Sequence, residues 1–277
     1  DAKEYTLTWV LDGTTVIEKY DCDAGIVKKV PPQKVGYTFD KWVDENGNEI
    51  SIPDTMPAND LTIKTTYTIN SHTITWIDGE NETVTNINYN EKITAETLSK
   101  TGWTFNGWFT AEGKKPADYG TMPDADLTFT ASWTIQQFKF SFVTDGTAVS
   151  DIVRDFDAAI GAEPTSEKDG YNFLGWSSTE GGAVEALPEK MPAENRTYYA
   201  VWEAKMFTIT FNSDGGSDIA PIEAPYLSKV NAPTAPAKDG YDFGGWATTK
   251  GIIDESQAVT FPYEMPLNGT TLYAIWL

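Results

Sequence analysis

Alternation of apolar and polar side chains is the clearest pattern along the chain. Four short stretches place a large apolar residue at nearly every second position, and an Asp-Gly pair follows each stretch. A period of two is typical of a half-buried strand, and Asp-Gly favours a tight hairpin because glycine tolerates positive φ. The stretches are Tyr5–Trp9, His72–Trp76, Phe138–Phe142 and Phe207–Phe211. Each therefore predicts the first strand of a hairpin.

Two further strands and one less regular segment complete each unit of this pattern. A returning strand, such as Thr15–Tyr20, follows the turn, and a last alternating strand closes the unit. Between them, residues 90–100 predict a short helix with Ile93 and Leu98 as buried positions. Prolines limit any helix at this place in the other units to a turn or two. The predicted order is β-β-short α-β-β.

Three anchors recur in fixed order and show that the chain is a tandem repeat. A glycine followed by an aromatic residue, then phenylalanine and tryptophan, occurs four times at nearly even spacing. These motifs begin at Gly36, Gly102, Gly170 and Gly240. A Met-Pro pair follows each, at Met56, Met122, Met191 and Met265, and an aromatic residue lies 11 positions further on, at Tyr67, Trp133, Trp202 and Trp276. We therefore expect four modules, at residues 1–68, 69–134, 135–203 and 204–277.

These motifs resemble the Listeria–Bacteroides repeat, also called the internalin B-repeat, over essentially the whole chain. The resemblance implies a compact β-grasp-like module, arranged in tandem on bacterial surface and secreted proteins. It implies no enzymatic activity and supplies no catalytic residue. The first repeat departs most from the pattern, because Lys41 replaces the glycine before Trp42 and Tyr67 replaces the terminal tryptophan. We expect that repeat to keep the fold with somewhat different packing.

Charge argues against a nucleic-acid partner. The chain has 20 lysine and arginine residues against 41 aspartate and glutamate residues, a net charge of −21 that repels phosphates and anionic lipids. The acidic residues are spread over all four repeats, as in a coat that maintains solubility. No apolar run is long enough to cross a membrane, so we expect no insertion by this segment. The chain opens on no signal sequence and closes on no lipidation motif, which predicts a mature or excised fragment.

Residue chemistry gives little material for catalysis or metal binding. With Cys22 the only cysteine and His72 the only histidine, no internal disulfide, ordinary zinc site or Ser-His relay is expected. Aspartate pairs such as Asp124 and Asp126 do not continue into a calcium loop of the D-x-D-x-D-G type. The carboxylates differ from repeat to repeat and do not suggest a glycosidase pair. We expect no cofactor, no metal and no catalytic residue.

Ten tryptophans raise the alternative of carbohydrate binding, because exposed indoles stack on sugar rings. All ten occupy positions shared between repeats, and so small a module needs its large aromatic residues for its own core. We therefore interpret them as core residues.

The loop between the central tryptophan and the Met-Pro pair is the most variable segment. It spans 14, 14, 15 and 19 positions in successive repeats. In the fourth repeat it contains Ile252, Ile253, Phe261 and Tyr263, which are candidate partner-binding residues because repeat proteins bind partners through loops. Neutral variation in length is the competing explanation.

The sequence predicts a β-rich α+β chain of four modules in an elongated, monomeric array. The function it favours is that of a non-catalytic spacer, stalk or adhesion segment of an extracellular or cell-surface protein. The alternative is a module that binds a glycan or a host or cell-surface protein through variable loops or grooves between repeats.

Overall fold

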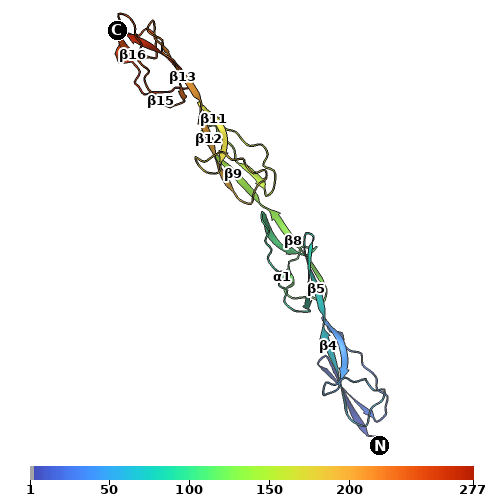
Figure 1. Ribbon diagram of the computed structural model, residues 1–277. Coiled ribbons are helices and arrows are strands. Elements are labelled where there is room, and N and C mark those ends of the chain that lie inside the picture. Colours follow the sequence, from blue (N-terminus) through green and yellow to red (C-terminus); the bar gives the residue numbers. More distant parts are fainter. Residues whose placement is uncertain (1–2) are drawn as a thin grey trace. The chain divides into compact units, whose positions relative to one another are not determined.

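A computed structural model describes residues 3–277, so the expected start of the first module at residue 1 lies outside the described residues. The chain divides into two compact units, up to Thr134 and from Ile135 onward. Each unit contains two four-stranded sheets, and the second also has a two-stranded sheet (Figure 1). Each four-stranded sheet is built from the strands of one repeat.

The strands of the first unit form two sheets of the same design. The first sheet contains β1 (Glu4–Leu11), β2 (Thr14–Asp21), β3 (Tyr37–Val43) and β4 (Leu61–Ile69). The second contains β5 (Ser71–Asp78), β6 (Asn81–Asn88), β7 (Trp103–Phe109) and β8 (Leu127–Ile135), with a one-turn helix α1 (Pro116–Tyr119) before β8.

The second unit repeats this design with a shorter second strand, of four residues instead of eight. Its first sheet contains β9 (Gln137–Val143), β10 (Ile152–Asp155), β11 (Tyr171–Ser177) and β12 (Arg196–Ala204). Its second contains β13 (Met206–Asn212), β14 (Ile222–Pro225), β16 (Phe243–Ala247) and β18 (Thr270–Trp276). The pair β15 (Lys229–Val230) and β17 (Tyr263–Glu264) and the 3₁₀ turn η1 (Glu255–Gln257) lie between these strands in sequence.

All four sheets have the same strand order, second-first-fourth-third. The first two strands are antiparallel in every sheet. In the first two repeats a two-residue turn that includes the glycine of the Asp-Gly pair joins them, as predicted, whereas loops at residues 144–151 and 213–221 join them in the third and fourth. The fourth strand then lies parallel to the first, for example with Trp9 opposite Ile63. The third strand joins the outer side of the fourth in antiparallel register, for example with Tyr37 opposite Ile69. The prediction of a β-rich fold is confirmed.

The helix predicted over residues 90–100 is wrong: this segment has neither a helix nor a regular strand in the structure. Its backbone groups bond to the Met-Pro segment instead of to one another, since the Asn90 amide donates to the Met122 carbonyl at 2.8 Å and the Ile93 amide to Gly120 at 3.2 Å. The Glu96 carbonyl accepts the indole N–H of Trp108 at 2.7 Å. Ile93 is nevertheless buried, and Leu98 packs against the same core. The prediction that Ile93 and Leu98 lie at the core is therefore correct, but the helical period assigned to them is wrong.

A bulge explains the glycine that precedes the central tryptophan. The third strand shifts register just before that tryptophan, between Phe173 and Gly175 and again between Phe243 and Gly245. Both glycines have a φ that L side chains rarely adopt, 141° and 122°. The first repeat also has the register shift, but Lys41 reaches it without a left-handed φ. The departure noted in the sequence is therefore a local change of backbone.

Each repeat closes its own apolar core on one face of its sheet. The buried members are Leu7, Trp9, Ile26, Met56 and Ile63 in the first repeat, and Ile74, Trp76, Ile93, Trp108, Met122 and Phe129 in the second. They are Phe140, Phe142, Ile160, Trp176, Met191 and Tyr198 in the third, and Ile209, Phe211, Val230, Trp246, Met265, Leu272, Ala274 and Trp276 in the fourth. The Met-Pro methionine is thus a core residue in every repeat.

The tryptophans lie in these cores or against their edges. Six are buried, namely Trp9, Trp76, Trp108, Trp176, Trp246 and Trp276, and the other four are half-buried. Aromatic rings contact one another edge to face, as Trp76 and Trp108 do at 5.1 Å. Such pairs add about 0.5–1.5 kcal/mol beyond burial of their area.

Candidate functional site

The most regular polar feature is a lysine that lies over two aromatic rings in every repeat. The lysine is two positions before the motif glycine, and its ammonium is 4.1–4.6 Å from the ring that follows that glycine and 5.4–6.0 Å from the terminal aromatic ring. The four lysines are Lys34, Lys100, Lys168 and Lys238. We call this arrangement the lysine cluster. A repeated Lys-x-Gly pattern marks the lysine cluster in the sequence, although it was not among the predicted site residues.

The Asp-Gly turn supplies the negative partner of this cluster. Lys34 pairs with Asp12 at 2.8 Å and Lys168 with Asp145 at 2.6 Å, while Lys238 donates to the Asp214 backbone carbonyl at 3.0 Å. The Lys168 hydrogen bond lowers the pKa of the Asp145 carboxyl. In the first, third and fourth repeats the cluster therefore ties the first turn to the third and fourth strands, and in the second repeat the Trp133 indole donates to Asp78 at 2.8 Å instead.

A groove lies beside the lysine cluster of the third repeat, within the second unit. Its volume is about 1030 Å³, and it is lined by Lys168, Tyr171, Phe173 and Trp202 from the third repeat and by Leu267 from the fourth. A smaller groove of about 460 Å³ has the same position beside the first repeat. Aromatic residues and amides are the usual components of a sugar site, but the lysine ammonium already lies over the rings. The lysine therefore covers one face of each of these two rings, Tyr171 and Trp202.

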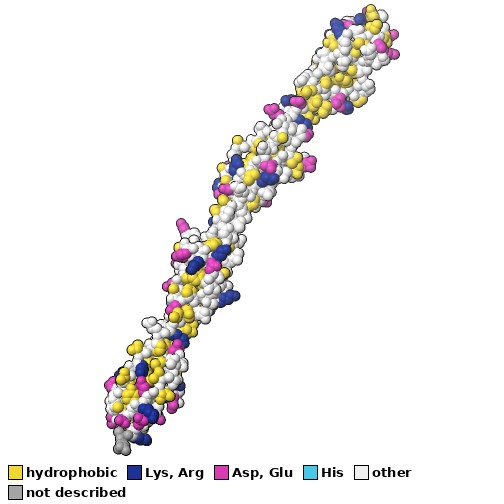
Figure 2. Space-filling view, turned by 180° about the vertical axis from the view of Figure 1, so that it is seen from behind, with side chains coloured by type: hydrophobic (Ala, Val, Ile, Leu, Met, Phe, Trp, Pro, Cys, Tyr) yellow, Lys and Arg dark blue, Asp and Glu magenta, His cyan; other side chains and the backbone are white. Residues whose placement is uncertain are grey.

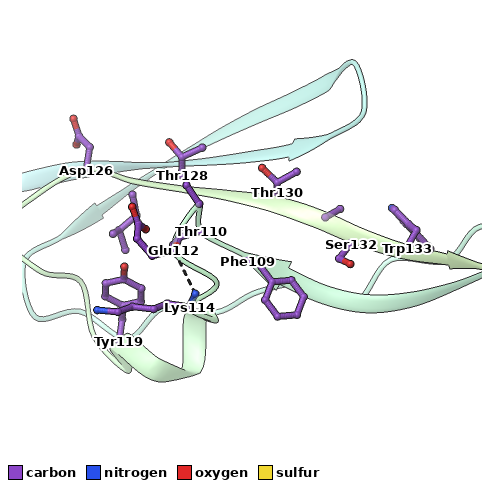
Figure 3. A pocket seen from close by; sticks show the side chains of 13 residues that line it. Phe109, Thr110, Glu112, Lys114, Tyr119, Asp126, Thr128, Thr130, Ser132 and Trp133 are labelled. Atoms are coloured by element: carbon purple, nitrogen blue, oxygen red, sulfur yellow. Dashed lines mark hydrogen bonds between the residues drawn. The ribbon is translucent and has the colours of Figure 1, made fainter.

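A third groove, of about 990 Å³, lies along β8 in the second repeat (Figure 3). Its floor is a row of hydroxyl groups, and Phe109, Tyr119, Glu112, Lys114 and Asp126 stand around it. A hydrogen bond from Thr110 lowers the pKa of Glu112, and the Thr73 amide lowers the pKa of Asp126. The lowered pKa values favour the ionised form of both carboxyls. The hydroxyl residues of the floor are Thr128, Thr130 and Ser132.

The four candidate loop residues do not form one surface. Phe261 and Tyr263 pack against the core of the fourth repeat, with ring centroids 6.1 Å apart. Tyr263 also belongs to β17 and pairs with Val230. Ile253 is 79% exposed, and Ile252 is half-buried. Ile253 is the member of the set most accessible to a partner.

Cys22 and His72 are both half-buried. Partial burial raises the pKa of the Cys22 thiol, with Asp23 as the second cause, so the thiol stays protonated and weakly nucleophilic at neutral pH. His72 lies between two carboxylates, 2.8 Å from Asp124 and 3.6 Å from Asp126. Within residues 3–277, His, Cys, Asp and Glu side chains form no group of three that could hold a metal ion.

Charge and apolar character are both dispersed over the surface. On the face drawn in Figure 2, acidic and basic side chains are interspersed on both units, and apolar side chains form small groups. No helix among the described residues is long and apolar enough to cross a membrane.

The repeat architecture belongs to a known family. The sequence profile of the Listeria-Bacteroides repeat domain matches four times, at residues 5–64, 72–132, 138–201 and 207–275. These matches cover most of the chain, and the chain therefore belongs to this family. The resemblance inferred from the glycine, Met-Pro and terminal aromatic anchors is confirmed.

Relatives with similar sequence are longer proteins. A protein of Evansella cellulosilytica that carries the name Gly-rich membrane protein is 29% identical over 268 residues, covering 88% of this chain and 31% of that protein. A membrane protein of the same organism is 31% identical over 185 residues, covering 64% and 27%. Internalin H of Listeria monocytogenes is 38% identical over 115 residues, covering 40% and 20%. The chain thus spans less than a third of the length of these relatives.

Proposed function

We propose that this chain is a non-catalytic spacer segment of a bacterial cell-surface or secreted protein. The observation that carries the proposal is that each repeat has its own closed core, so that the chain is a series of similar bodies. The family and the names of the relatives, an internalin and two membrane proteins, support a location at the cell surface. Such a segment would hold a neighbouring domain away from the surface.

The module boundaries and the finer description of the fold belong to the same proposal. We place four independently folding modules at residues 1–68, 69–134, 135–203 and 204–277. The strand order second-first-fourth-third, with the first and fourth strands parallel, supports a β-grasp-like module in which a non-helical segment replaces the helix.

A display experiment tests the spacer role. The chain is placed between a membrane anchor and a tag domain on a bacterial surface, and antibody access to the tag is measured. Deletion of one repeat after another should lower access step by step, and an unrelated spacer of equal length should restore it. Failure of length-matched spacers to restore access would contradict the proposal.

A second candidate role is recognition of a protein partner through the loop of the fourth repeat. The exposed Ile253 supports this role, since it lies in the longest of the four variable loops. Binding to host matrix proteins or glycans that disappears in Ile253→Ser, with the repeat still folded, would favour recognition over spacing.

A further inference from the structure

The junction between the first and second repeats is built around one tyrosine. Tyr89 follows β6, and its amide donates to the Asn70 carbonyl at 2.8 Å, while the Asn70 amide donates to the Gly36 carbonyl at 2.9 Å. The Tyr89 ring meets the Tyr37 ring edge to face, with centroids 6.1 Å apart. Gly36 and Tyr37 belong to the glycine motif of the first repeat. Two successive backbone hydrogen bonds thus join the glycine motif of one repeat to the end of the hairpin of the next.

The junction between the third and fourth repeats has the same construction. The Tyr226 amide donates to the Lys205 carbonyl at 2.9 Å, and the Lys205 amide donates to the Gly170 carbonyl at 2.9 Å. The Tyr226 ring meets the Tyr171 ring edge to face at 5.7 Å. We call the glycine and its following aromatic residue the socket, and the tyrosine of the next repeat the plug.

Two features favour glycine in the socket: a positive φ, 77° at Gly36 and 79° at Gly170, and the close approach of the plug ring. A β-carbon at Gly36 would lie 1.9 Å from the Tyr89 ring, and one at Gly170 would lie 2.3 Å from the Tyr226 ring. Real β-carbons essentially never approach another heavy atom to within 3.0 Å, so the plug ring occupies the space that any other side chain would fill. At both junctions, the glycine that marks the repeat in the sequence thus serves the contact with the next repeat.

The fourth repeat has the same socket residues, and no side chain among residues 3–277 contacts them as Tyr89 and Tyr226 contact theirs. Gly240 has no heavy atom within 4 Å of the position of a β-carbon, and Tyr241 is 53% exposed, whereas Tyr37 and Tyr171 are half-buried. The Lys238 ammonium still lies 4.5 Å over the Tyr241 ring. We propose that Gly240 and Tyr241 form an interaction surface that receives the aromatic plug of another module of this family. This inference goes beyond the spacer role and does not depend on it.

The plug position identifies the partner. It immediately precedes a residue with positive φ in each repeat, and it is occupied by Cys22, Tyr89, Phe156 and Tyr226. The first repeat therefore carries a small thiol where the others carry a ring. End-to-end pairing of two molecules of this chain would place Cys22 at the socket and leave Tyr241 without its ring contact. The fitting partner is a module with tyrosine or phenylalanine at this position.

The test extends the chain by one repeat. Residues 69–134 are added directly after Leu277, so that Leu277 takes the place of Thr68 and the added counterpart of Tyr89 faces Gly240. Hydroxyl-radical labelling read by mass spectrometry follows Tyr241, whose peptide stays unique in the longer chain. Labelling of Tyr241 should fall several-fold on extension, to the level of Tyr37 and Tyr171 in the same molecule.

Substitutions in the added repeat alone provide the control. Tyr89→Cys, which copies the first repeat, and Tyr89→Ala should both return Tyr241 to the labelling of the four-repeat chain. Protease resistance of the added repeat shows whether the added repeat has folded. If it has not folded, residues 135–203, whose plug is Phe156, are added in place of residues 69–134. Equal labelling of Tyr241 with and without a folded extension, or equal protection by plug and plugless extensions, would overturn the proposal.

Discussion

Buried polar atoms distinguish residues that look alike in the sequence. The central tryptophans Trp108 and Trp176 donate their indole N–H to backbone carbonyls of the non-helical middle segment, both at 2.7 Å. Trp246 occupies the same place in the fourth repeat, but its buried indole nitrogen has no hydrogen-bond partner among residues 3–277. A buried donor without a partner costs about 1–3 kcal/mol. Burial of the central tryptophan should therefore stabilise the fourth repeat less than it stabilises the second and third.

Replacement of each central tryptophan by phenylalanine tests this difference. Trp108→Phe removes a hydrogen bond and leaves the Glu96 carbonyl without its donor, whereas Trp246→Phe removes only an unpaired donor. Both lose similar volume, so we expect Trp108→Phe to cost its repeat about 1–2 kcal/mol more than Trp246→Phe costs the fourth. Urea unfolding followed by resolved NMR signals of each repeat measures both. Equal losses would show that the indole hydrogen bond contributes nothing.

Asp124 is the group through which we expect the first junction to respond to acid. Its carboxylate accepts hydrogen bonds from the Asn70 side chain at 2.7 Å, from His72 at 2.8 Å and from the Gly36 amide at 3.0 Å. These bonds, that of Asn70 first, lower the pKa of Asp124. Since the folded-state pKa lies below the unfolded value, the stabilisation is present above the unfolded pKa. It is lost as the pH falls through the folded pKa.

This loss of stabilisation at low pH predicts that the contact between the first and second repeats depends measurably on pH. The Tyr37–Tyr89 contact should loosen as the pH falls below about 4, the ordinary value for an aspartate. Asp124→Asn should weaken the contact at neutral pH and remove most of its acid dependence. The Tyr171–Tyr226 contact, where Leu267 has the sequence place of Asp124, is the internal control. NMR shifts of the two tyrosine pairs between pH 3 and 7 report both; parallel changes at the two junctions would exclude a role for Asp124.

At the scale of elements, the backbone of the middle segment is fixed by other segments. The Glu96 carbonyl and the Pro164 carbonyl have the same partner, the indole of the central tryptophan in their repeats. The third repeat thus already has proline at the place of Glu96. A non-helical segment accepts proline, whereas a helix interior would lose about 3 kcal/mol or more.

Two proline variants test whether the middle segment of the second repeat is helical or non-helical. Glu96→Pro should leave the melting temperature of the second repeat nearly unchanged, because the carbonyl is kept. Ile93→Pro should cost at least about 2 kcal/mol, because it removes a buried side chain and the amide bond to Gly120. Thermal melts followed by tryptophan fluorescence compare the two. A large loss for Glu96→Pro would indicate that helical structure matters in this segment.

The local pattern of apolar and polar residues predicted the strands, whereas contacts between residues distant in sequence determine the features that were not predicted. Alternation placed the first strand of every repeat, and the apolar positions of the predicted helix identified Ile93 as a buried residue, because strand period and burial are local properties. The same local signals suggested a helix for residues 90–100, where bonds to the distant Met-Pro segment determine the backbone. The lysine cluster and the socket were missed for a related reason: they join residues such as Lys34 and Tyr67, or Gly36 and Tyr89, that are far apart in sequence.

At the scale of the whole molecule, near-equal repeat spacing predicts an extended particle. Repeats of similar length that each close a separate core are expected to follow one another in series. Four modules in line would reach on the order of 110–140 Å, whereas a compact globule of this length has a radius of gyration of about 19 Å. Small-angle scattering should give a clearly larger radius. A value near that of the globule would contradict the serial arrangement.

Separate cores also predict that one repeat can unfold without the others. Trp108 is buried between Trp76 and Phe105, so Trp108→Ala should remove roughly 3–5 kcal/mol from the second repeat. That loss is comparable to the whole stability of so small a domain, so the second repeat should melt first while the others persist. Proteolysis should then cut within residues 69–134, and scanning calorimetry should show one early transition. A single later transition would mean that the repeats unfold together, and an unchanged melt with lost polysaccharide binding would assign Trp108 to a binding surface.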